Sequence, residues 1–408
     1  MKFRLFVIPL CLALLAQGAS LTLNEALSRV EAGHPWFHTR ESLAALGQIR
    51  HDTARSGPAA SVSLEVENIL GTGSLSAARD AETTLQFSRV FDRAGRRDSR
   101  EALAVAQGEA ERLQWLEKRR ALLAEAAQRF IRVAAAQITL ELAQEHADLA
   151  HKTAITLKQR HSSAVAPAGD LAQAQLALSE AQLEAEHAEH LLLSARQSLA
   201  TLWGAEEPDF DAAIANFDTL PDIADYPVLA AQLKDTPIQA RHAAEFRWQQ
   251  AREKLARRTI ARGDIRWSAG LRRNEATDDF GFVLGVGYTW PDTTAPVRLA
   301  ETRAEQDRSR ADAETALLEA RAVLYALLQE LNHARIEFLA SRDEMEPAAQ
   351  AWVDSIEAGV SRGRYGATDA IAARTALFEA RCRRIAAATE YHSTLVTIEQ
   401  MLAGSANP

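Results

Sequence analysis

The sequence is poor in residues that interrupt helices and in residues that crosslink small folds. Its 408 residues include only 19 glycines, 12 prolines and two cysteines, and aromatic residues make up 6%. This composition excludes a collagen-like chain and a disulfide-stapled scaffold, and 47% hydrophobic residues exclude a disordered chain. The net charge of −9 argues against nucleic acid as a partner, because such a partner needs a basic surface. The abundance of alanine and leucine favours long helices.

The first twenty residues are predicted to be a signal peptide, so that the mature protein is exported. Lys2 and Arg4 precede an apolar run at residues 5–15, which is too short to span a bilayer. Small residues then fit cleavage after Gly18 or after Ser20, and both sites remain open. No later stretch could cross a bilayer as a helix.

The two cysteines cannot form a structural crosslink in the mature chain. Cys11 lies within the predicted signal peptide, without the small residues of a lipoprotein cleavage site, and we expect no lipid anchor. Cys382 is then alone, which excludes an internal disulfide and a zinc site built from cysteines.

The rest of the sequence is predicted to contain an internal duplication. The segments 170–202 and 369–401 align at an offset of 199 residues, which pairs Asp170 with Asp369. Each half reads as a helix, a β-hairpin and a pair of long helices. The predicted segments are the first repeat at 21–225, with a β-hairpin at about 61–90 and helices at about 95–203, the second repeat at 226–404, with a β-hairpin at about 264–291 and helices at about 297–403, and a tail at 405–408.

The long helices are predicted to pack as antiparallel, coiled-coil-like hairpins. Residues 94–160 contain no proline and only two glycines, and at 1.5 Å per residue they would form a rod of roughly 100 Å. The corresponding helix of the second half contains Pro347, which should kink it. No globular core needs helices of this length, so each must bury a narrow apolar stripe on its neighbours.

The four strand segments alternate apolar or small residues with polar ones. Each is about 9–11 residues long, which is the length of a tilted strand that crosses a bilayer. Four strands cannot close a barrel by themselves, whereas three chains would supply twelve. The pattern therefore indicates either an obligate oligomer in the outer membrane or two soluble hairpins that cap a helical bundle.

Several motifs resemble those of the TolC-type outer-membrane factors over essentially the whole mature chain. The opening segment 21–37 is similar to the first helix of that family, with Leu-x-x-Ala-Leu followed by a proline about eight residues later. The first hairpin and the first helix tip are most similar to the cobalt-zinc-cadmium efflux branch. The matching residues are Glu65, Glu67-Asn68, Gly71, Gly73, Glu82-Thr83-Thr84, Ala94-Gly95-Arg96-Arg97 and Val165-Ala166-Pro167.

This resemblance implies a homotrimeric exit duct. A twelve-stranded barrel would lie in outer-membrane lipid, and a long α-helical barrel would continue into the periplasm. Its inner end would meet a periplasmic adaptor, a membrane fusion protein, and beyond it an inner-membrane efflux pump. The branch implies heavy-metal cations as cargo. Drugs or type I secreted polypeptides as cargo, and an exported scaffold without a channel, remain the alternatives.

The two helix–turn–helix tips, at 162–170 and 362–369, are the candidate functional segments. By position alone, Asp170 and Asp369 are expected to be helix N-caps. The resemblance adds that the tips contact the adaptor and that the second tip narrows the pore. The pore-constriction candidates are Asp369, Arg362, Arg364 and Tyr365. The adaptor-docking candidates are Val165, Pro167, Gly169, Asp170, Gly363 and Gly366.

Neither a metal site nor a catalytic site is predicted. His187 and His190, and likewise His34 and His38, have spacings that can place two ligands on one helix face. Eleven histidines on long polar helices produce such pairs by chance, so we assign no metal ligands and no cofactor. The sequence also has no phosphate-binding loop, His-Glu-x-x-His or Gly-x-Ser-x-Gly motif, and we expect no enzyme.

Overall fold

The computed structural model describes residues 20–75, 78–91, 95–260, 263–290, 293–360 and 365–402. These residues form long helical hairpins and one four-stranded sheet, which confirms the predicted mainly α-helical fold class with a β part. The chain divides into two compact units, and each takes segments from both halves of the sequence. Unit 1 comprises 1–37, 119–229 and 323–401, and unit 2 comprises 38–118, 230–322 and 402–408. Except for Ser20, the predicted signal peptide lies outside the described residues.

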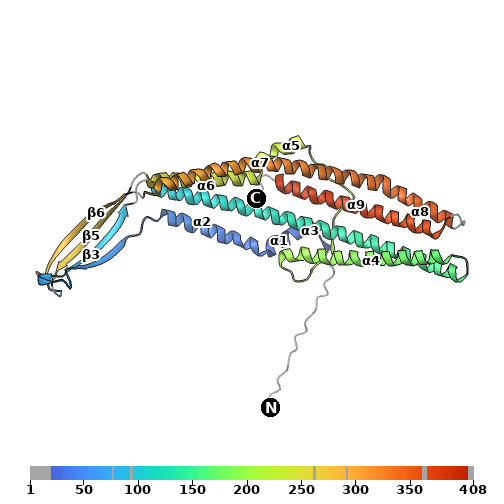
Figure 1. Cartoon of the computed structure of the whole chain (residues 1–408), viewed down its shortest axis with the longest axis horizontal. Coiled ribbons are helices and arrows are strands. Elements are labelled where there is room, and N and C mark those ends of the chain that lie inside the picture. Colours follow the sequence, from blue (N-terminus) through green and yellow to red (C-terminus); the bar gives the residue numbers. More distant parts are fainter. Residues whose placement is uncertain are drawn as a thin grey trace, which may run out of the picture. The chain divides into compact units, whose positions relative to one another are not determined.

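Unit 1 is built around helical hairpins (Figure 1). Helix α3 turns back into α4, and α8 turns back into α9. The long helices are α3 (Arg96–Ser162), α4 (Ala168–Ala200), α7 (Ala295–Ala340), α8 (Glu346–Val360) and α9 (Ala367–Leu402). The shorter elements are β1 (Ser20–Leu21), α1 (Leu23–Gly33), η1 (Pro35–His38), η3 (Thr201–Trp203), β4 (Ala212–Ala213) and α5 (Tyr226–Gln232). Within the described chain, no helix combines the length and the apolar character that a membrane span requires.

Alanines at seven-residue spacing form the buried seams of α4 and α9. The buried alanines of α4 are Ala174, Ala181 and Ala188, and those of α9 include Ala373, Ala380 and Ala387. A seven-residue repeat keeps one narrow stripe facing the neighbouring helices, and small side chains let those helices approach closely. The two sets differ by the same 199 residues as the sequence alignment, which supports the predicted duplication.

The helix that contains Pro347 changes its hydrogen bonding just before the proline. Helix α7 ends at Ala340, a π-helical turn occupies Ser341–Met345, and α8 begins at Glu346. Proline has no N–H to donate, and its ring collides with the carbonyl four residues earlier in a regular α-helix. A π-helical turn widens the helix at that point, so the chain continues past the proline.

A connecting segment at residues 205–225, which we call the strap, fastens the helices of unit 1 together. The Gln137 side chain of α3 accepts from the Ala213 N–H at 2.7 Å and donates to its carbonyl at 3.2 Å. Tyr391 of α9 donates its hydroxyl to the Pro221 carbonyl. Gln137 belongs to the first half of the sequence and Tyr391 to the second. The strap therefore connects the two halves within one core.

Unit 2 contains helices and the four-stranded sheet. Its helices are α2 (Thr39–Arg55), α6 (Pro237–Ile260) and the adjoining parts of α3 and α7, and η2 (Gly73–Leu75) and η4 (Leu233–Asp235) are short 3₁₀ turns. Ion pairs between helices join them. A guanidinium nitrogen of Arg50 lies 2.5 Å from a carboxylate oxygen of Glu111, and one of Arg241 lies 2.6 Å from a carboxylate oxygen of Glu117. Half-exposed pairs of this kind fix register more than they add stability.

The sheet is antiparallel throughout and joins strands from both halves of the sequence. Its order is β2-β3-β5-β6, so that β3 of the first hairpin pairs with β5 of the second. The strands are β2 (Ser61–Glu67), β3 (Glu82–Phe91), β5 (Asp264–Asn274) and β6 (Asp279–Thr289). Both hairpins fall where the sequence predicts them. Figure 1 shows β3, β5 and β6 side by side.

The strand register separates apolar and polar side chains onto opposite faces of the sheet. Residues paired across strands share a face, and successive residues of one strand alternate between faces. Leu85 pairs with Leu271, which pairs with Phe282, so these three share one face. We call this the apolar face, and it comprises Val62, Leu64, Val66, Leu85, Phe87, Phe91, Ile265, Trp267, Ala269, Leu271, Phe280, Phe282, Leu284, Val286 and Tyr288, with Thr83, Arg89 and Arg273 as its polar exceptions.

The opposite face is polar or glycine-rich. Near the C-terminal end of β5, Arg272 reaches β3 and β2, and its guanidinium donates to Glu82 at 2.7 Å and to Glu67 at 3.2 Å. The other members of this polar face include Ser61, Ser63, Glu65, Thr84, Gln86, Ser88, Arg266, Ser268, Gly281, Gly285 and Gly287. A sheet with one apolar and one hydrophilic face is suited to contact an apolar environment on one side and water on the other.

Candidate functional site

The first tip turns at an alanine in the left-handed conformation. Helix α3 ends at Ser162, and Ala164 has φ 55°, a region that normally favours glycine. The Val165 N–H donates to the Arg160 carbonyl at 2.8 Å, which closes the turn. A glycine is usual at this position in the resembled branch, and the structure keeps the glycine-like backbone with alanine.

The expectation that Asp170 and Asp369 are N-caps is wrong, because both helices begin earlier. Pro167 is the N-cap of α4, and its extended backbone (ψ 152°) lets the helix start at Ala168. Helix α9 starts at Ala367. Both aspartates are therefore third helical residues, where a carboxylate favours the helix N-terminus. Asp369 also accepts a hydrogen bond from the Gly366 N–H at 3.0 Å, which is half of a capping box.

Predicted residues from both tips line one groove within unit 1. It has a volume of about 250 Å³, and it brings Val165, Pro167 and Asp170 together with Tyr365 and Gly366. Thr368 donates to Gln173 at 2.6 Å, which holds the start of α9 against α4. The groove thus joins the two tips into a single surface.

The remaining predicted tip residues do not line this groove. Gly169 is exposed in the first turn of α4, and a side chain built there would meet no atom within 4 Å. Asp369 is exposed on the first turn of α9. Arg362, Gly363 and Arg364 lie outside the described residues.

Sequence reasoning missed Arg374, which joins three helices behind the tips. From α9 it donates to Thr153 of α3 at 2.6 Å and to Glu357 of α8 at 2.8 Å. About two helical turns further along α9, the Arg381 guanidinium lies 3.2 Å from the Glu145 carboxylate of α3. The seven-residue spacing of the two arginines is visible in the sequence, but their partners are distant along the chain.

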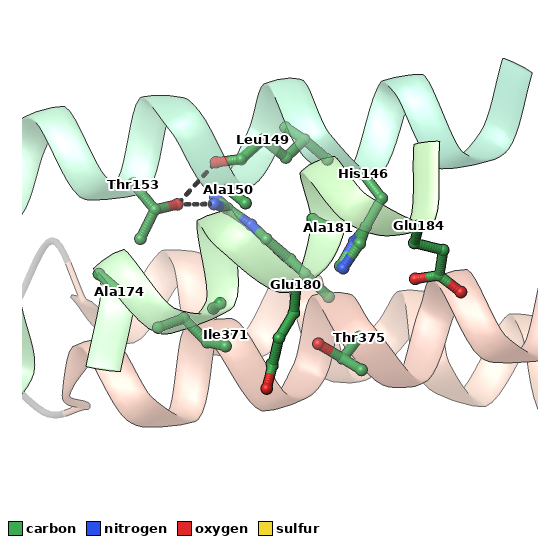
Figure 2. A pocket seen from close by; sticks show the side chains of 12 residues that line it. His146, Leu149, Ala150, Thr153, Ala174, Glu180, Ala181, Glu184, Ile371 and Thr375 are labelled. Carbon is green, nitrogen blue, oxygen red and sulfur yellow. Dashed lines mark hydrogen bonds between the residues drawn. The ribbon is translucent and has the colours of Figure 1, made fainter. Parts of the chain in front are cut away.

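A second cavity lies further from the tips than the groove, among α3, α4 and α9 (Figure 2). It has a volume of about 120 Å³, and Figure 2 shows the His146 ring entering it from α3, with Glu180 and Glu184 on α4. The His146 ring stacks on Phe378 of α9, with centroids 4.6 Å apart. Alanines of α3 and α4 form much of the wall, so small residues create the space.

Burial shifts the pKa values of two groups at this cavity, His146 and Glu184, in the directions that favour their neutral forms. Burial, and then the charge of Arg374, lowers the pKa of His146. Burial, and then the nearby Glu379, raises the pKa of Glu184. Both shifts have the same principal cause, which is partial exclusion of water from the helix junction.

The described side chains include no group of three or more histidine, cysteine, aspartate or glutamate residues arranged to hold a metal ion. His187 and His190 are exposed on α4, where His190 lies 3.7 Å from Glu186. His34 accepts a hydrogen bond from the Trp36 N–H at 3.1 Å in the turn after α1.

The thiol of Cys382 is expected to react slowly with alkylating reagents. Burial, and then the charges of Glu184 and Glu379, raises its pKa to about 11. Because only the thiolate reacts, alkylation at pH 8 should be about 100-fold slower than for a thiol of ordinary pKa. Iodoacetamide labelling followed by mass spectrometry measures this rate. A rate that levels off near pH 9 in the folded protein would contradict the expectation, and the denatured chain provides the unshifted reference.

Comparison with known proteins gives one curated relative and a set of similar structures. No family model matches the chain. The chain is 25% identical over 327 residues to the cobalt-zinc-cadmium resistance protein CzcC of Cupriavidus metallidurans, and the match covers 78% of this chain and 77% of CzcC.

Two solved structures illustrate the similarity of fold. The structure of CusC, described in terms of transmembrane channel formation, matches with a TM-score of 0.78 and 14% identity, over 95% of this chain and 93% of CusC. The outer membrane protein VceC of Vibrio cholerae matches with a TM-score of 0.75 and 16% identity, over 94% of this chain and 96% of VceC. At these identities the structures establish the fold. The comparisons confirm the resemblance to the TolC-type outer-membrane factors, and the fold of this chain is the fold of those outer-membrane channels.

Proposed function

We propose that this chain is the outer-membrane channel component of a tripartite efflux system. Three copies form a passive duct through the outer membrane, with a large helical portion in the periplasm. The duct catalyses no reaction, and the energy for transport comes from an inner-membrane pump that a periplasmic adaptor connects to it.

The two-faced sheet is the observation that carries this proposal. In a bilayer the apolar face meets lipid and the polar face lines water. Within the described residues, β2 and β6 have no strand partner on their outer edges, and unpaired backbone groups are not tolerated in lipid. Pairing β6 of one copy with β2 of the next removes both edges. Three copies then give a closed barrel of twelve strands.

The mass of the particle extracted from outer membranes tests this proposal. The expected particle requires detergent for extraction and has the mass of three mature chains. A species that salt alone releases as a monomer or dimer would contradict the channel and would favour an exported scaffold capped by soluble hairpins.

Heavy-metal cations are the proposed cargo. This proposal rests on the 25% identity to a cobalt-zinc-cadmium resistance protein and on the hairpin motif between Glu65 and Arg97. Deletion of the gene should lower tolerance to zinc, cobalt or cadmium and leave tolerance to drugs unchanged. Loss of drug tolerance alone would contradict metal cargo and indicate drugs. Failure to secrete a polypeptide would indicate a secreted polypeptide as the cargo.

The tips are the proposed contact with the adaptor and the proposed constriction of the pore. Val165, Pro167, Asp170 and Gly366 line the groove into which an adaptor tip would fit, with Gly169 and Gly363 beside them in the sequence. In a trimer, the second tips would approach one another around the axis. Asp369 and Tyr365, together with Arg362 and Arg364, are then the proposed constriction residues.

Opening of the duct is proposed to require release of α9 from α3 and α8. Arg374→Leu removes the hydrogen bonds to Thr153 and Glu357 that hold these helices together. We expect the purified trimer to show a higher conductance in planar bilayers than the unsubstituted trimer. The matched control is Arg383→Leu on the same helix, whose arginine is half-exposed and lies 4.0 Å from Glu337. Equal conductance for the two variants would contradict this role of Arg374.

A further inference from the structure

Two arginines interrupt the apolar face of the sheet, and they differ in what surrounds their charge. Arg273 of β5 lies 3.0 Å from Asp278 and 3.4 Å from Glu275. Arg89 of β3 is exposed, and among the described residues it takes part in no hydrogen bond or ion pair. The described chain therefore supplies a counter-charge for Arg273 and none for Arg89.

Arg89 lies at the end of the sheet where every strand joins a helix. It is two residues before the end of β3, and α3 begins five residues after that end. Short connections at the same end join α2 to β2, α6 to β5, and β6 to α7. In the proposed channel the helices lie in the periplasm, so this end of the sheet lies at the inner leaflet of the outer membrane.

Aromatic side chains surround Arg89 on the same face. Trp267 of β5 pairs directly with Arg89, and its ring centroid lies 5.5 Å from that of Phe87. Tyr288 near the end of β6 and Trp290 just beyond it have ring centroids 4.7 Å apart, and Trp290 is 78% exposed. Tryptophan and tyrosine gather where the hydrocarbon of a bilayer meets the headgroups. These rings therefore place Arg89 at that boundary rather than at the bilayer midplane.

An arginine at this boundary is suited to bind a lipid phosphate. Its aliphatic stem can lie along the apolar rings while the guanidinium reaches the headgroup layer. The guanidinium offers paired N–H donors that match two phosphate oxygens. A zwitterionic headgroup brings its own ammonium to balance its phosphate, whereas an anionic headgroup leaves that charge unbalanced. A cation without a carboxylate partner therefore favours the anionic headgroup.

We propose that Arg89, flanked by Phe87 and Trp267, binds the phosphate of an anionic glycerophospholipid in the inner leaflet, with one such site on each copy of the chain. This proposal rests on the proposed function, because it requires the apolar face to meet lipid. It adds a specific lipid partner to that function.

Native mass spectrometry of the full protein, extracted from outer membranes in detergent, tests the site. Phosphatidylglycerol and phosphatidylcholine are added in separate titrations. The unsubstituted trimer should bind phosphatidylglycerol more tightly than phosphatidylcholine. Arg89→Gln should lower the affinity for phosphatidylglycerol about fivefold, which is the factor for one cation near an anionic lipid surface. The affinity for phosphatidylcholine should not change.

Arg266 supplies a matched control on the opposite face. It is exposed at the same end of the sheet, and it pairs with Val90 and Gly287 on the polar face. In the proposed barrel that face meets water. Arg266→Gln removes the same charge, and the preference for phosphatidylglycerol should remain that of the unsubstituted trimer.

The outcomes separate the headgroup site from the proposed function. An unsubstituted trimer without a preference for phosphatidylglycerol overturns the site and leaves the channel in place. The same conclusion follows if Arg89→Gln keeps the full preference, or if the two variants lose it equally. A chain that salt releases from membranes without detergent overturns the proposed function, and the headgroup site with it.

Discussion

Replacement of Leu284 by arginine is expected to prevent the chain from assembling in the outer membrane. Leu284 lies at the middle of β6 on the apolar face, and it is 83% exposed in the single chain. If that face meets lipid, each copy places an arginine near the bilayer midplane, at about 2–4 kcal/mol per residue. Three copies in one barrel multiply this penalty. Heat-modifiable trimer on gels of outer-membrane fractions measures the assembly, and we expect the Leu284→Arg trimer to be absent.

The neighbouring position supplies a matched control. Val283→Arg introduces the same side chain one residue away, on the polar face, where Val283 pairs with Gly270. That arginine would point toward the aqueous interior of the proposed barrel, so trimer should still form. Equal loss of trimer in the two variants would mean that the effect is general damage to β6. Equal retention would contradict lipid contact of the apolar face.

The strands could be predicted from the sequence because a period of two is a local property. Phe282, Leu284 and Val286 recur at every second position of β6, with the smaller residues Val283 and Gly285 between them, and this period of two is enough to identify a strand. Which strands are neighbours is not a local property. The pairing of β3 with β5 joins Leu85 to Leu271, almost 190 positions apart, and only this pairing extends the apolar residues of single strands into one continuous face.

The tips could be located from the sequence, but their internal geometry could not. A proline or glycine followed by an acidic residue signals a helix start. The same pattern is compatible with a carboxylate at the N-cap and with a carboxylate on the third residue of the helix. In the structure, α4 starts directly after Pro167 and α9 starts directly after Gly366, so the aspartates are the third residues of their helices. Arg374 illustrates a different difficulty. Its partners Thr153 and Glu357 come from other helices, and nothing adjacent to Arg374 in the sequence indicates them.

Replacement of Gln137 by leucine is expected to release the strap locally from α3. Ala213 is buried, and the Gln137 amide satisfies both its N–H and its carbonyl. Leucine has a similar size but no polar atoms, so both backbone groups would lose a partner at about 1–3 kcal/mol each. Local opening should then become more frequent. Hydrogen exchange of strap peptides that contain Ala213 should accelerate by a factor of at least about 30, which corresponds to the lower limit of about 2 kcal/mol for the two groups together.

The same substitution elsewhere on α3 shows why the effect should be confined to the strap. Gln128 donates to the Thr397 hydroxyl at 3.0 Å, and that hydroxyl also donates to the Ser393 carbonyl. Gln128→Leu therefore leaves no buried backbone group without a partner, and exchange in the strap should stay unchanged. If Gln137→Leu also left the exchange unchanged, the bidentate contact would not hold the strap, and the β1–β4 ladder with the Tyr391 contact would have to suffice. If both variants accelerated exchange equally, the cause would be a general loosening of α3 rather than loss of the partners of Ala213.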